Sequence, residues 1–390
     1  MKIAVVVDQY GGHSNGTTAA AKSFVRVMRS RGHEVFVITA DSDDTEPNAF
    51  MVKPKSFPGF NKRIRSHGMI IAKKDAATLR KAFLGMDLVY VFLPFYLAKQ
   101  SKQIADEMGI PAFISFHLPP EHITQNIGLG NAPLITHFVH LNWRKTFNLY
   151  KDFHVPSEPL KKILKRKGYK SKIHVVSNGF CPEFTTTKVD KPEGLEDKFI
   201  IVTSGRLAKE KRHEVIIKAI AKSKYSDKIQ LIICGTGSRK KYLEKFGTKM
   251  LTNMPIVKYC KKEELIQTFN YADLYVHASM VEAESIACME AFATGKVPII
   301  SNGKFSAAAQ FVLDKEKDLF NENDSKDLAE KIDFYIENPV ILKQQGAKYA
   351  EHAKQFHAES CADKLENILK MVIEKHKQER EESAEHYELK

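Results

Sequence analysis

Residues 271–300 constrain the fold most strongly, because an apolar segment, a short polar loop, a helical pattern and a second apolar segment follow one another there. The apolar segments 271–279 and 297–300 predict buried strands, and Gly295 marks the end of the helix between them. Strands that alternate with helices predict an α/β fold with a doubly wound parallel sheet. Ligands bind such sheets at the carboxyl ends of the strands, so the loop after the first strand is a candidate site.

Two glutamates belong to this stretch. Glu282 lies in the loop that follows the first predicted strand, and Glu290 lies further along, on the helix. Ser285 and Ile286 stand where the helix begins, and the free N–H groups and positive dipole of a helix N-terminus suit a phosphate. A carboxylate beside that phosphate could hold the hydroxyl groups of a sugar or ribose. The alternative is a surface helix with two solvated glutamates.

The loop 204–211 follows another predicted strand, 199–203, and contains Arg206 and Lys211. Cations at the end of a strand can neutralise a diphosphate. Arg can donate two parallel hydrogen bonds to it, and Lys supplies a point charge. The alternative is a pair of solvated surface cations. The sequence therefore offers a second loop that could bind an anionic ligand.

Three glycines lie in comparable loops. Gly235 and Gly237 follow the predicted strand 230–234, where they either let the backbone approach a nucleotide or form an ordinary turn. Gly16 precedes a predicted helix near the start of the chain, where it either contacts a ligand or only supplies backbone freedom. The opening strand-helix-strand unit lacks a full Gly-x-Gly-x-x-Gly fingerprint, so a dinucleotide site is weakly indicated.

His117 directly follows the predicted strand 112–116. A histidine at the carboxyl end of a strand is well placed for a polar contact with a substrate. A lone histidine is otherwise more often structural, so both interpretations stay open at this point.

Several of these motifs resemble the large retaining family of GT-B-fold nucleotide-sugar glycosyltransferases. The family has two glutamates separated by seven residues, as Glu282 and Glu290 are, and a Gly-Arg-Leu…Glu-Lys signature that is similar to residues 205–211. Gly32-His33-Glu34-Val35 resembles the end of the family's first helix. The family usually has Gly-Phe-Gly where this chain has Ala283-Glu284-Ser285, which leaves donor detail open.

The resemblance implies two facing doubly wound domains with the site in the cleft, and it implies roles for individual residues. The second glutamate holds the donor's ribose and the first approaches the donor sugar, while the Arg and Lys grip the pyrophosphate and stabilise the leaving diphosphate. A His near the transferred sugar and a glycine at a phosphate complete the set. The implied catalytic residues are His117, Glu282, Arg206 and Lys211, and the implied donor-binding residues are Gly16, Arg206, Lys211, Gly235, Gly237, Ser285, Ile286 and Glu290.

The same resemblance, together with composition, predicts the domain limits. Residues 1–184 form an acceptor- or membrane-facing domain, 185–197 a polar linker, and 198–355 a nucleotide-sugar-binding domain. A terminal helix, 356–390, is expected to cross back to the first domain and to fray from residue 379 onward. We expect no tightly bound cofactor and no metal, since no Asp-x-Asp motif stands out and the cationic pair could replace one.

Positive charge is concentrated in the first half. Residues 1–180 carry 26 Lys and Arg against 13 Asp and Glu, whereas the rest of the chain is balanced, so the net charge of +13 belongs to the first half. Two segments, Lys53–Lys81 and Lys161–Lys172, could lie on an anionic membrane or could be solvated faces. Nucleic acid is the alternative partner, but no nucleic-acid motif supports it.

These features lead to a specific expectation. The chain transfers a hexose, from UDP-glucose or UDP-galactose, to a membrane lipid such as diacylglycerol or phosphatidylinositol; the runner-up is a soluble transferase that acts on a polysaccharide or small molecule. Five cysteines without a Cys-x-x-Cys pair argue against a disulfide framework, and Met1-Lys2 leads directly into a strand without a signal peptide. We therefore expect a cytoplasmic protein, peripheral on the inner face of the membrane.

Overall fold

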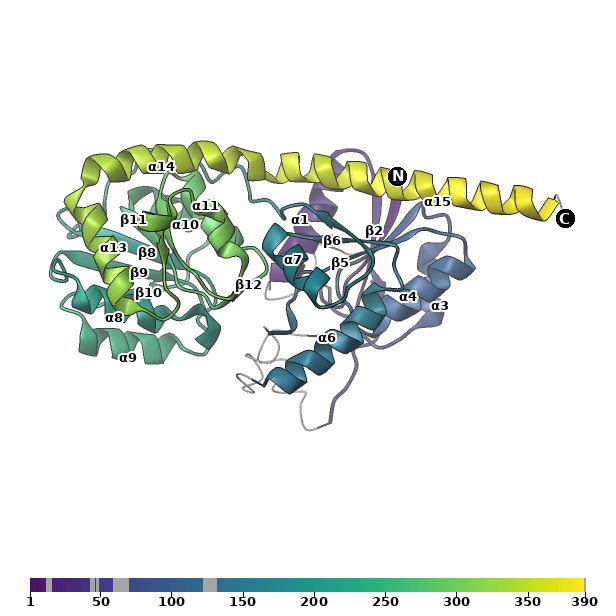
Figure 1. The fold of residues 1–390 in the computed structure, drawn as a ribbon, viewed down its shortest axis with the longest axis horizontal. Helices are drawn as coiled ribbons and strands as arrows, with labels where there is room; N and C mark the ends of the chain where they lie inside the picture. The colour runs from purple at the N-terminus through teal and green to yellow at the C-terminus, as the bar shows by residue number, and fades with distance from the viewer. Residues whose placement is uncertain (12–15, 43–45, 47–48, 59–69, 122–131, 389–390) are drawn as a thin grey trace. The chain divides into compact units, whose positions relative to one another are not determined.

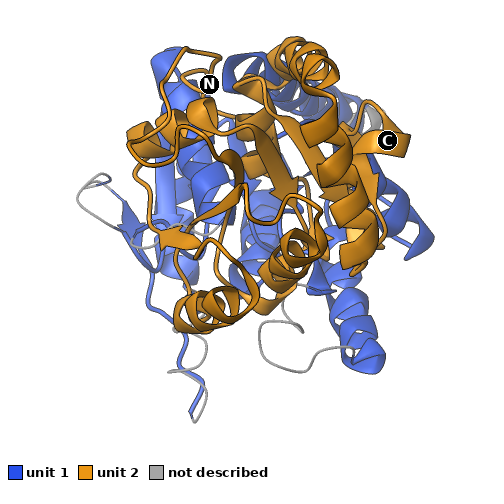
Figure 2. Ribbon diagram, turned by 90° about the vertical axis from the view of Figure 1, so that its left-hand side faces the viewer, with its two compact units in different colours: residues 1–178, 358–390 blue, residues 179–357 orange. Residues whose placement is uncertain are grey.

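The computed structural model describes residues 1–11, 16–42, 46, 49–58, 70–121 and 132–388. The chain forms two compact units (Figures 1 and 2). Unit 1 comprises Met1–Asn178 together with Ala358–Lys390, and unit 2 comprises Gly179–His357. The part of Lys53–Lys81 at residues 59–69 lies outside the described residues.

Unit 1 contains a seven-stranded parallel sheet in the order β3-β2-β1-β4-β5-β6-β7. The central strands are buried on both faces, which explains their continuous apolar sequences. The order reverses between β1 and β4, so this pair forms the switch point of the sheet. The strands are β1 (Lys2–Val6), β2 (Glu34–Thr39), β3 (Phe50–Met51), β4 (Leu88–Val91), β5 (Ala112–Ser115), β6 (Asp152–Val155) and β7 (Lys172–Val175).

Local capping fixes where several helices of unit 1 begin. Asp75 accepts a hydrogen bond from Thr78 N at 3.0 Å at the start of α3, and Ser157 caps α7 through Leu160 N. The helices of unit 1 are α1 (Gly16–Ser30), α3 (Ala76–Phe83), α4 (Tyr96–Glu107), α6 (Pro133–Phe147), α7 (Glu158–Arg166) and α15 (Ala358–Glu388).

The terminal helix α15 packs on α1 within unit 1 (yellow in Figure 1). Arg31 Nη1 lies 2.9 Å from the carboxylate of Glu366, and Arg380 Nη1 donates to Gly109 O at 2.9 Å. The segment from residue 379, where fraying is expected, is helical as far as Glu388. The contact of Arg380 with Gly109 joins α15 to the segment that follows α4.

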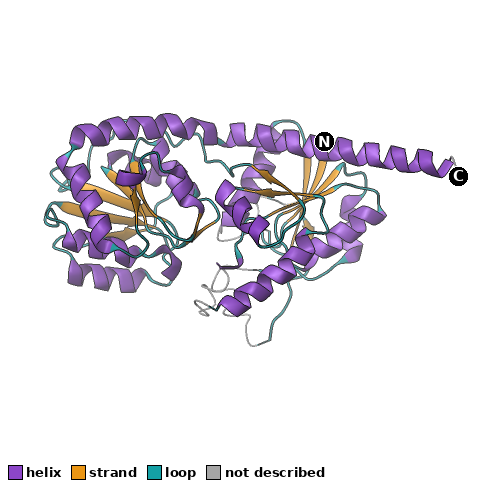
Figure 3. Cartoon of the chain, in the orientation of Figure 1, coloured by secondary structure: helices purple, strands orange, loops and turns teal. Residues whose placement is uncertain are grey.

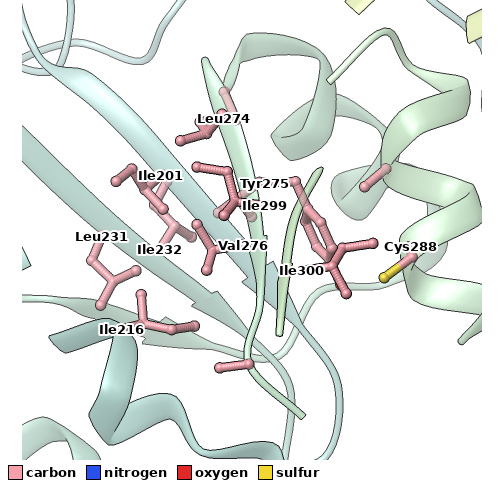
Figure 4. Close-up of a cluster of buried hydrophobic side chains, with 14 of the residues drawn as sticks. Ile201, Ile216, Leu231, Ile232, Leu274, Tyr275, Val276, Cys288, Ile299 and Ile300 are labelled. Carbon is pink, nitrogen blue, oxygen red and sulfur yellow. The ribbon is translucent and has the colours of Figure 1, made fainter. Parts of the chain in front are cut away.

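Unit 2 has a six-stranded parallel sheet in the order β10-β9-β8-β11-β13-β15 and a separate two-stranded parallel pair, β12-β14 (Figure 3). Figure 4 shows its core, where Ile216 of α8 and Cys288 of α11 lie on either side of the central strands. The strands are β8 (Phe199–Ser204), β9 (Ile229–Cys234), β10 (Ile256–Lys258), β11 (Leu274–His277), β12 (Val281–Glu282), β13 (Val297–Ser301), β14 (Phe305–Ser306) and β15 (Leu319–Phe320).

The segment 305–313 has an apolar pattern that favours a helix, but Phe305 and Ser306 pair with β12, and only a 3-10 turn follows. Pairing with the strand that carries Glu282 outweighs the local helical pattern. The helices are η1 (Lys209–Lys211), α8 (His213–Lys222), α9 (Lys240–Met250), α10 (Lys262–Tyr271), α11 (Ile286–Ala293), η2 (Ala307–Phe311), α12 (Lys315–Asp318), α13 (Ser325–Glu337), α14 (Pro339–Ala353) and η3 (Lys354–Phe356).

The unit boundaries lie at residues 178/179 and 357/358, compared with the expected limits near 184 and 355. The polar segment 185–197 lies within unit 2, where Thr187 N donates to Asn270 Oδ1 and Lys191 Nζ lies 2.7 Å from the carboxylate of Asp273.

Across the part of the chain that the structure describes, no helix is long and apolar enough to cross a membrane.

Candidate active site

The candidate site of unit 2 lies where the strand order reverses, between β8 and β11. The loops that follow these two strands carry most of the predicted residues, and they are joined by a hydrogen bond from Met280 N to Glu210 O at 2.9 Å. The parallel register of β8 and β11 brings their carboxyl ends to one edge of the sheet. Residues that are about 70 positions apart in the sequence therefore meet at this edge.

Glu282 is the centre of this cluster. It lies on β12, is buried, and its Oε1 atom is 3.0 Å from His277 Nε2. The same oxygen forms an ion pair with Lys211 Nζ. The structure therefore brings Lys211 and Glu282 into direct contact and adds His277, to which the sequence analysis assigned no role.

The electrostatics of His277 follow from these neighbours. Burial disfavours its charged form, but Cys288 and Glu282 more than offset that effect and raise the pKa of His277 to about 9. At neutral pH the imidazole is therefore protonated. It holds the Glu282 carboxylate from one side while Lys211 holds it from another.

Arg206 lies on the same loop as Lys211 and remains accessible. Its Nη2 atom is 2.9 Å from Glu210 Oε1, and 39% of the Arg206 side chain is exposed, compared with 2% for Glu210. A buried carboxylate that contacts one edge of the guanidinium fixes its orientation and leaves other N–H groups for a ligand. The arrangement suits an anion that approaches from solvent.

The glycines after β8 and β9 allow two loops to pack tightly. Gly205 N donates to Cys234 O at 3.0 Å and Leu207 N donates to Thr236 O at 2.8 Å. A Cβ atom at Gly235 would lie 1.9 Å from Gly205 O, and one at Gly237 would lie 2.5 Å from Leu207 O. Glycine is therefore required at both positions by the loop that carries Arg206, whether or not a nucleotide binds there.

Ser285 adopts a left-handed backbone with φ of +100° at the start of α11, and its Oγ lies 3.4 Å from His277 Nε2. Ile286 is the first residue of the helix. The N-terminus of α11, which the sequence analysis predicts to be a phosphate site, is thus next to the Glu282–His277 contact. Glu284, one of the three residues at which this chain departs from the Gly-Phe-Gly of the family, is buried.

Glu290 lies further along α11 and is only partly buried. Desolvation by burial nevertheless raises its pKa to about 8. Within the described part of the chain, Glu290 makes no hydrogen bond or ion pair with another side chain. A carboxyl group in this state is available to a ligand hydroxyl.

Two predicted residues, Gly16 and His117, belong to unit 1. The His117 ring stacks on Phe92 with 5.3 Å between centroids, and burial together with His154 keeps its pKa well below the usual value. Its Nε2 atom has no hydrogen-bond partner among the residues that the structure covers. The ring lines a small cavity of about 40 Å³ with Ser177 and Asn178, so a neutral imidazole nitrogen is available there.

Gly16 is the first residue of α1, and a Cβ atom there would meet nothing within 4 Å. Its φ is not in the left-handed region, so neither strain nor crowding requires glycine at this position. The residues directly before it, 12–15, lie outside the described residues.

Sequence reasoning missed His277, Glu210 and His213. His277 ends β11 in the same way that His117 follows β5, so the rule that selected His117 also applies to it. His213 is buried beside Lys211, His277 and Arg239, and burial is the main reason that its pKa falls to about 3. A neutral His213 limits repulsion within this cationic cluster. Its burial is a tertiary property that the sequence pattern did not reveal.

Comparison with known families agrees with this architecture. Residues 14–184 match the family described as Glycosyltransferase Family 4, and residues 185–356 match the family described as Glycosyl transferases group 1. Two GDP-mannose-dependent alpha-mannosyltransferases are related in sequence. The protein of Corynebacterium glutamicum is 26% identical over 317 residues (77% of this chain, 72% of that protein), and that of Mycolicibacterium smegmatis is 22% identical over 320 residues (77% and 79%).

Solved structures share the fold over nearly the whole chain. Anabaena Alr3699/HepE in complex with UDP and glucose superposes with a TM-score of 0.73 at 17% identity, covering 95% of this chain and 100% of that one. WaaG, a glycosyltransferase involved in lipopolysaccharide biosynthesis, gives 0.69 at 16% identity, covering 94% and 99%. With two doubly wound units and both family matches in agreement, the chain belongs to the GT-B-fold glycosyltransferases and is a hexosyltransferase.

Proposed function

We propose that this hexosyltransferase uses a nucleoside-diphosphate hexose held by unit 2 and retains the configuration of the anomeric carbon. The observation that carries the proposal is the contact of Lys211 and His277 with Glu282 at the switch point of the sheet, with Arg206, paired to Glu210, on the same loop as Lys211. Positive groups aimed at a departing diphosphate stabilise charge that develops in the transition state. In this assignment Arg206 and Lys211 bind the diphosphate, and the transfer needs neither a metal nor a tightly bound cofactor.

The two glutamates have separate roles in this proposal. Glu290 accepts hydrogen bonds from the ribose hydroxyls, which suits a partly buried carboxyl group without another partner. Glu282, held by His277, approaches the transferred sugar. Ser285, Ile286, Gly235 and Gly237 shape the backbone around the donor. The roles of Gly16 and His117 stay predictions, because both residues belong to unit 1.

The donor is UDP-glucose or UDP-galactose in this proposal, and GDP-mannose is the second candidate. The second candidate is supported by the names of the two sequence relatives, which are GDP-mannose-dependent. The HepE structure with UDP and glucose is 17% identical to this chain, so it supports the fold and not the choice of donor.

We further propose that the acceptor is a membrane lipid such as diacylglycerol, reached from the inner face of the membrane. Unit 1 carries 32 Lys and Arg against 22 Asp and Glu, a balance of +10, whereas unit 2 is close to neutral at +3. An excess of positive charge on one unit supports binding to anionic lipid, because each basic residue near such a surface is worth about 1 kcal/mol.

A donor screen tests the proposal directly. The purified protein is incubated with UDP-glucose, UDP-galactose and GDP-mannose, each with and without detergent-dispersed diacylglycerol, and nucleoside diphosphate release is measured. We expect one donor to be consumed and the release to rise when diacylglycerol is present. Release that rises only with a soluble saccharide acceptor would favour a soluble transferase, and release from none of the donors would contradict the assignment.

A further inference from the structure

Helix α6 presents an apolar face at its N-terminal end. Leu134 and Phe138 are 77% and 71% exposed, and Ile135 is 40% exposed. These positions are one turn apart or adjacent, so their side chains share one side of the helix. In Figure 1 this end of α6 lies below α3, α4 and α7 of unit 1. Large apolar side chains that gather in one exposed place mark an interaction surface more often than isolated ones do.

A cavity of about 400 Å³ lies against the other half of the same helix. Trp143 lines it from α6, Phe95 and Tyr96 line it from the start of α4, and Phe57 and Ile71 line it from the segments around β3. Its volume falls within the range of roughly 300–1,000 Å³ that is typical of sites for small ligands. The apolar face and the aromatic cavity therefore lie one after the other along α6.

The charges at this cavity are of one sign. Lys74 and Lys99 line it, and no carboxylate is among its described lining residues. Lys55 Nζ lies 3.7 Å from the centroid of the Tyr96 ring, which adds a third cation beside the cavity. Apolar walls with cations beside them match a lipid, whose acyl chains are apolar and whose bilayer surface carries phosphate groups.

We propose that the apolar face of α6 inserts into a bilayer and that the cavity receives an acyl chain of a glycerolipid. The inference rests on the proposed transfer to a lipid acceptor, for which it names the binding surface. The apolar face and the cavity contact acyl chains of the bilayer, while Lys55, Lys74 and Lys99 contact its phosphate groups. A second copy of the chain fits this surface less well, because a two-fold contact would bring the same lysines together.

Trp143 makes the proposal directly testable, because it is the only tryptophan of the sequence and it lines the cavity. The full-length protein is mixed with vesicles of phosphatidylglycerol and phosphatidylcholine whose acyl chains carry bromine atoms. Bromine quenches tryptophan fluorescence on contact, so we expect quenching that vesicles of the same lipids without bromine do not cause.

Paired variants locate the surface. Leu134→Ser and Phe138→Ser should each lower vesicle partitioning by about tenfold or more, as expected from the transfer free energy of one large apolar side chain. Leu84→Ser is the matched control, since Leu84 is also exposed, at 67%, and lies on unit 1 at the end of α3. We expect Leu84→Ser to bind as the parent does.

The outcomes separate this inference from the proposed function. Sedimentation with vesicles but no quenching would overturn the acyl site, as would equal partitioning of the α6 variants and Leu84→Ser. Loss of dimers in the α6 variants, with vesicle binding unchanged, would assign the face to a second copy and overturn the proposal. If quenching fails while detergent-dispersed diacylglycerol is still glycosylated, the proposed function stands without this surface. If quenching occurs but no donor is consumed, the surface stands and the proposed function fails.

Discussion

His277 Nε2 and Glu282 Oε1 lie 3.0 Å apart in the interior of unit 2, and Lys211 pairs with the same carboxylate oxygen. Two cationic groups therefore share one buried anion. A diphosphate that reaches Lys211 would compete with Glu282 for this cation, while His277 would keep the carboxylate in position. The contact explains how a buried glutamate can stay ionised beside a site for an anionic donor.

We expect Glu282→Gln to lower kcat strongly without weakening nucleotide binding, because its proposed partner is the transferring sugar and its loss frees Lys211 for the diphosphate. Steady-state kinetics and calorimetry with the free nucleoside diphosphate measure the two effects. Loss of nucleotide affinity equal to that of a Glu290→Gln variant would reject this division of roles.

The pH dependence of stability provides a second test of the same contact. The folded pKa of His277, about 9, is above its usual value of 6.5, so its contribution is fully present below pH 6.5 and is lost as pH rises through 9. Glu282→Gln removes an anion that holds this proton. Denaturant unfolding from pH 6 to 10 should therefore show a smaller decline in the variant, with a difference of at most about 3 kcal/mol. Parallel pH profiles in both proteins would contradict the pairing.

Arg206→Ala should reduce activity by roughly 10²–10³-fold, which is the scale for the loss of one charge-stabilising donor. The fold should remain intact by circular dichroism, since Arg206 is partly exposed. Lys209→Ala is the matched control, because Lys209 is an exposed cation three residues further along. Similar kinetics for both variants would show that position 206 has no special role.

Glu290→Gln should mainly weaken nucleotide binding, because it changes the hydrogen bonds to the ribose hydroxyls. It should also stabilise the free protein at high pH. The carboxyl has a raised folded pKa of about 8, so the parent loses stability as pH rises from its usual value through 8. We expect a gain of about 1–2 kcal/mol at pH 9, reduced by partial exposure. Calorimetry and denaturant unfolding check these two expectations, and an unchanged free energy of unfolding at pH 9 would argue against the raised pKa.

Gly235→Ala should destabilise unit 2 by about 1–3 kcal/mol, the usual cost of overpacking, because its Cβ would collide with Gly205 O. The loop with Arg206 would shift, so nucleotide affinity should fall as well. Gly16→Ala is the contrast, since it adds a methyl group in open space. Thermal unfolding should separate the two, and a loss of activity in a stable Gly16→Ala protein would support a ligand contact there.

Vesicle sedimentation tests the electrostatic part of membrane binding. Replacement of Lys161, Lys162, Lys165 and Arg166 on α7 with Ser should weaken binding to anionic vesicles, at about 1 kcal/mol per residue near the surface. Salt should weaken the parent's binding, since the Debye length falls from about 10 Å at 0.1 M to about 3 Å at 1 M. The control replaces four exposed lysines of α9 in unit 2, Lys240, Lys241, Lys245 and Lys249. Equal pelleting with neutral and anionic vesicles would remove the electrostatic anchor.

The sequence alone determined the α/β class and the position of the strands and helices around the candidate site. Apolar runs such as 199–203 and 274–277 become buried parallel strands because both faces of the sheet are covered, so no alternation is needed to reveal them. The motif around Arg206 and Lys211 could be found in the sequence because it directly follows the apolar run of a predicted strand, and loops at strand ends are candidate sites.

Tertiary structure decided which residues meet. His277 ends β11 and Glu282 lies on β12, which pairs with β14, so Phe305 and Ser306 belong to a strand and not to a helix. Burial of His213 and the raised pKa of Glu290 likewise depend on neighbours distant in sequence. The cavity beside Trp143 joins segments from three parts of unit 1. Local sequence determines propensity, but long-range packing sets desolvation and charge pairing, and these decide the protonation and position of the side chains at the site.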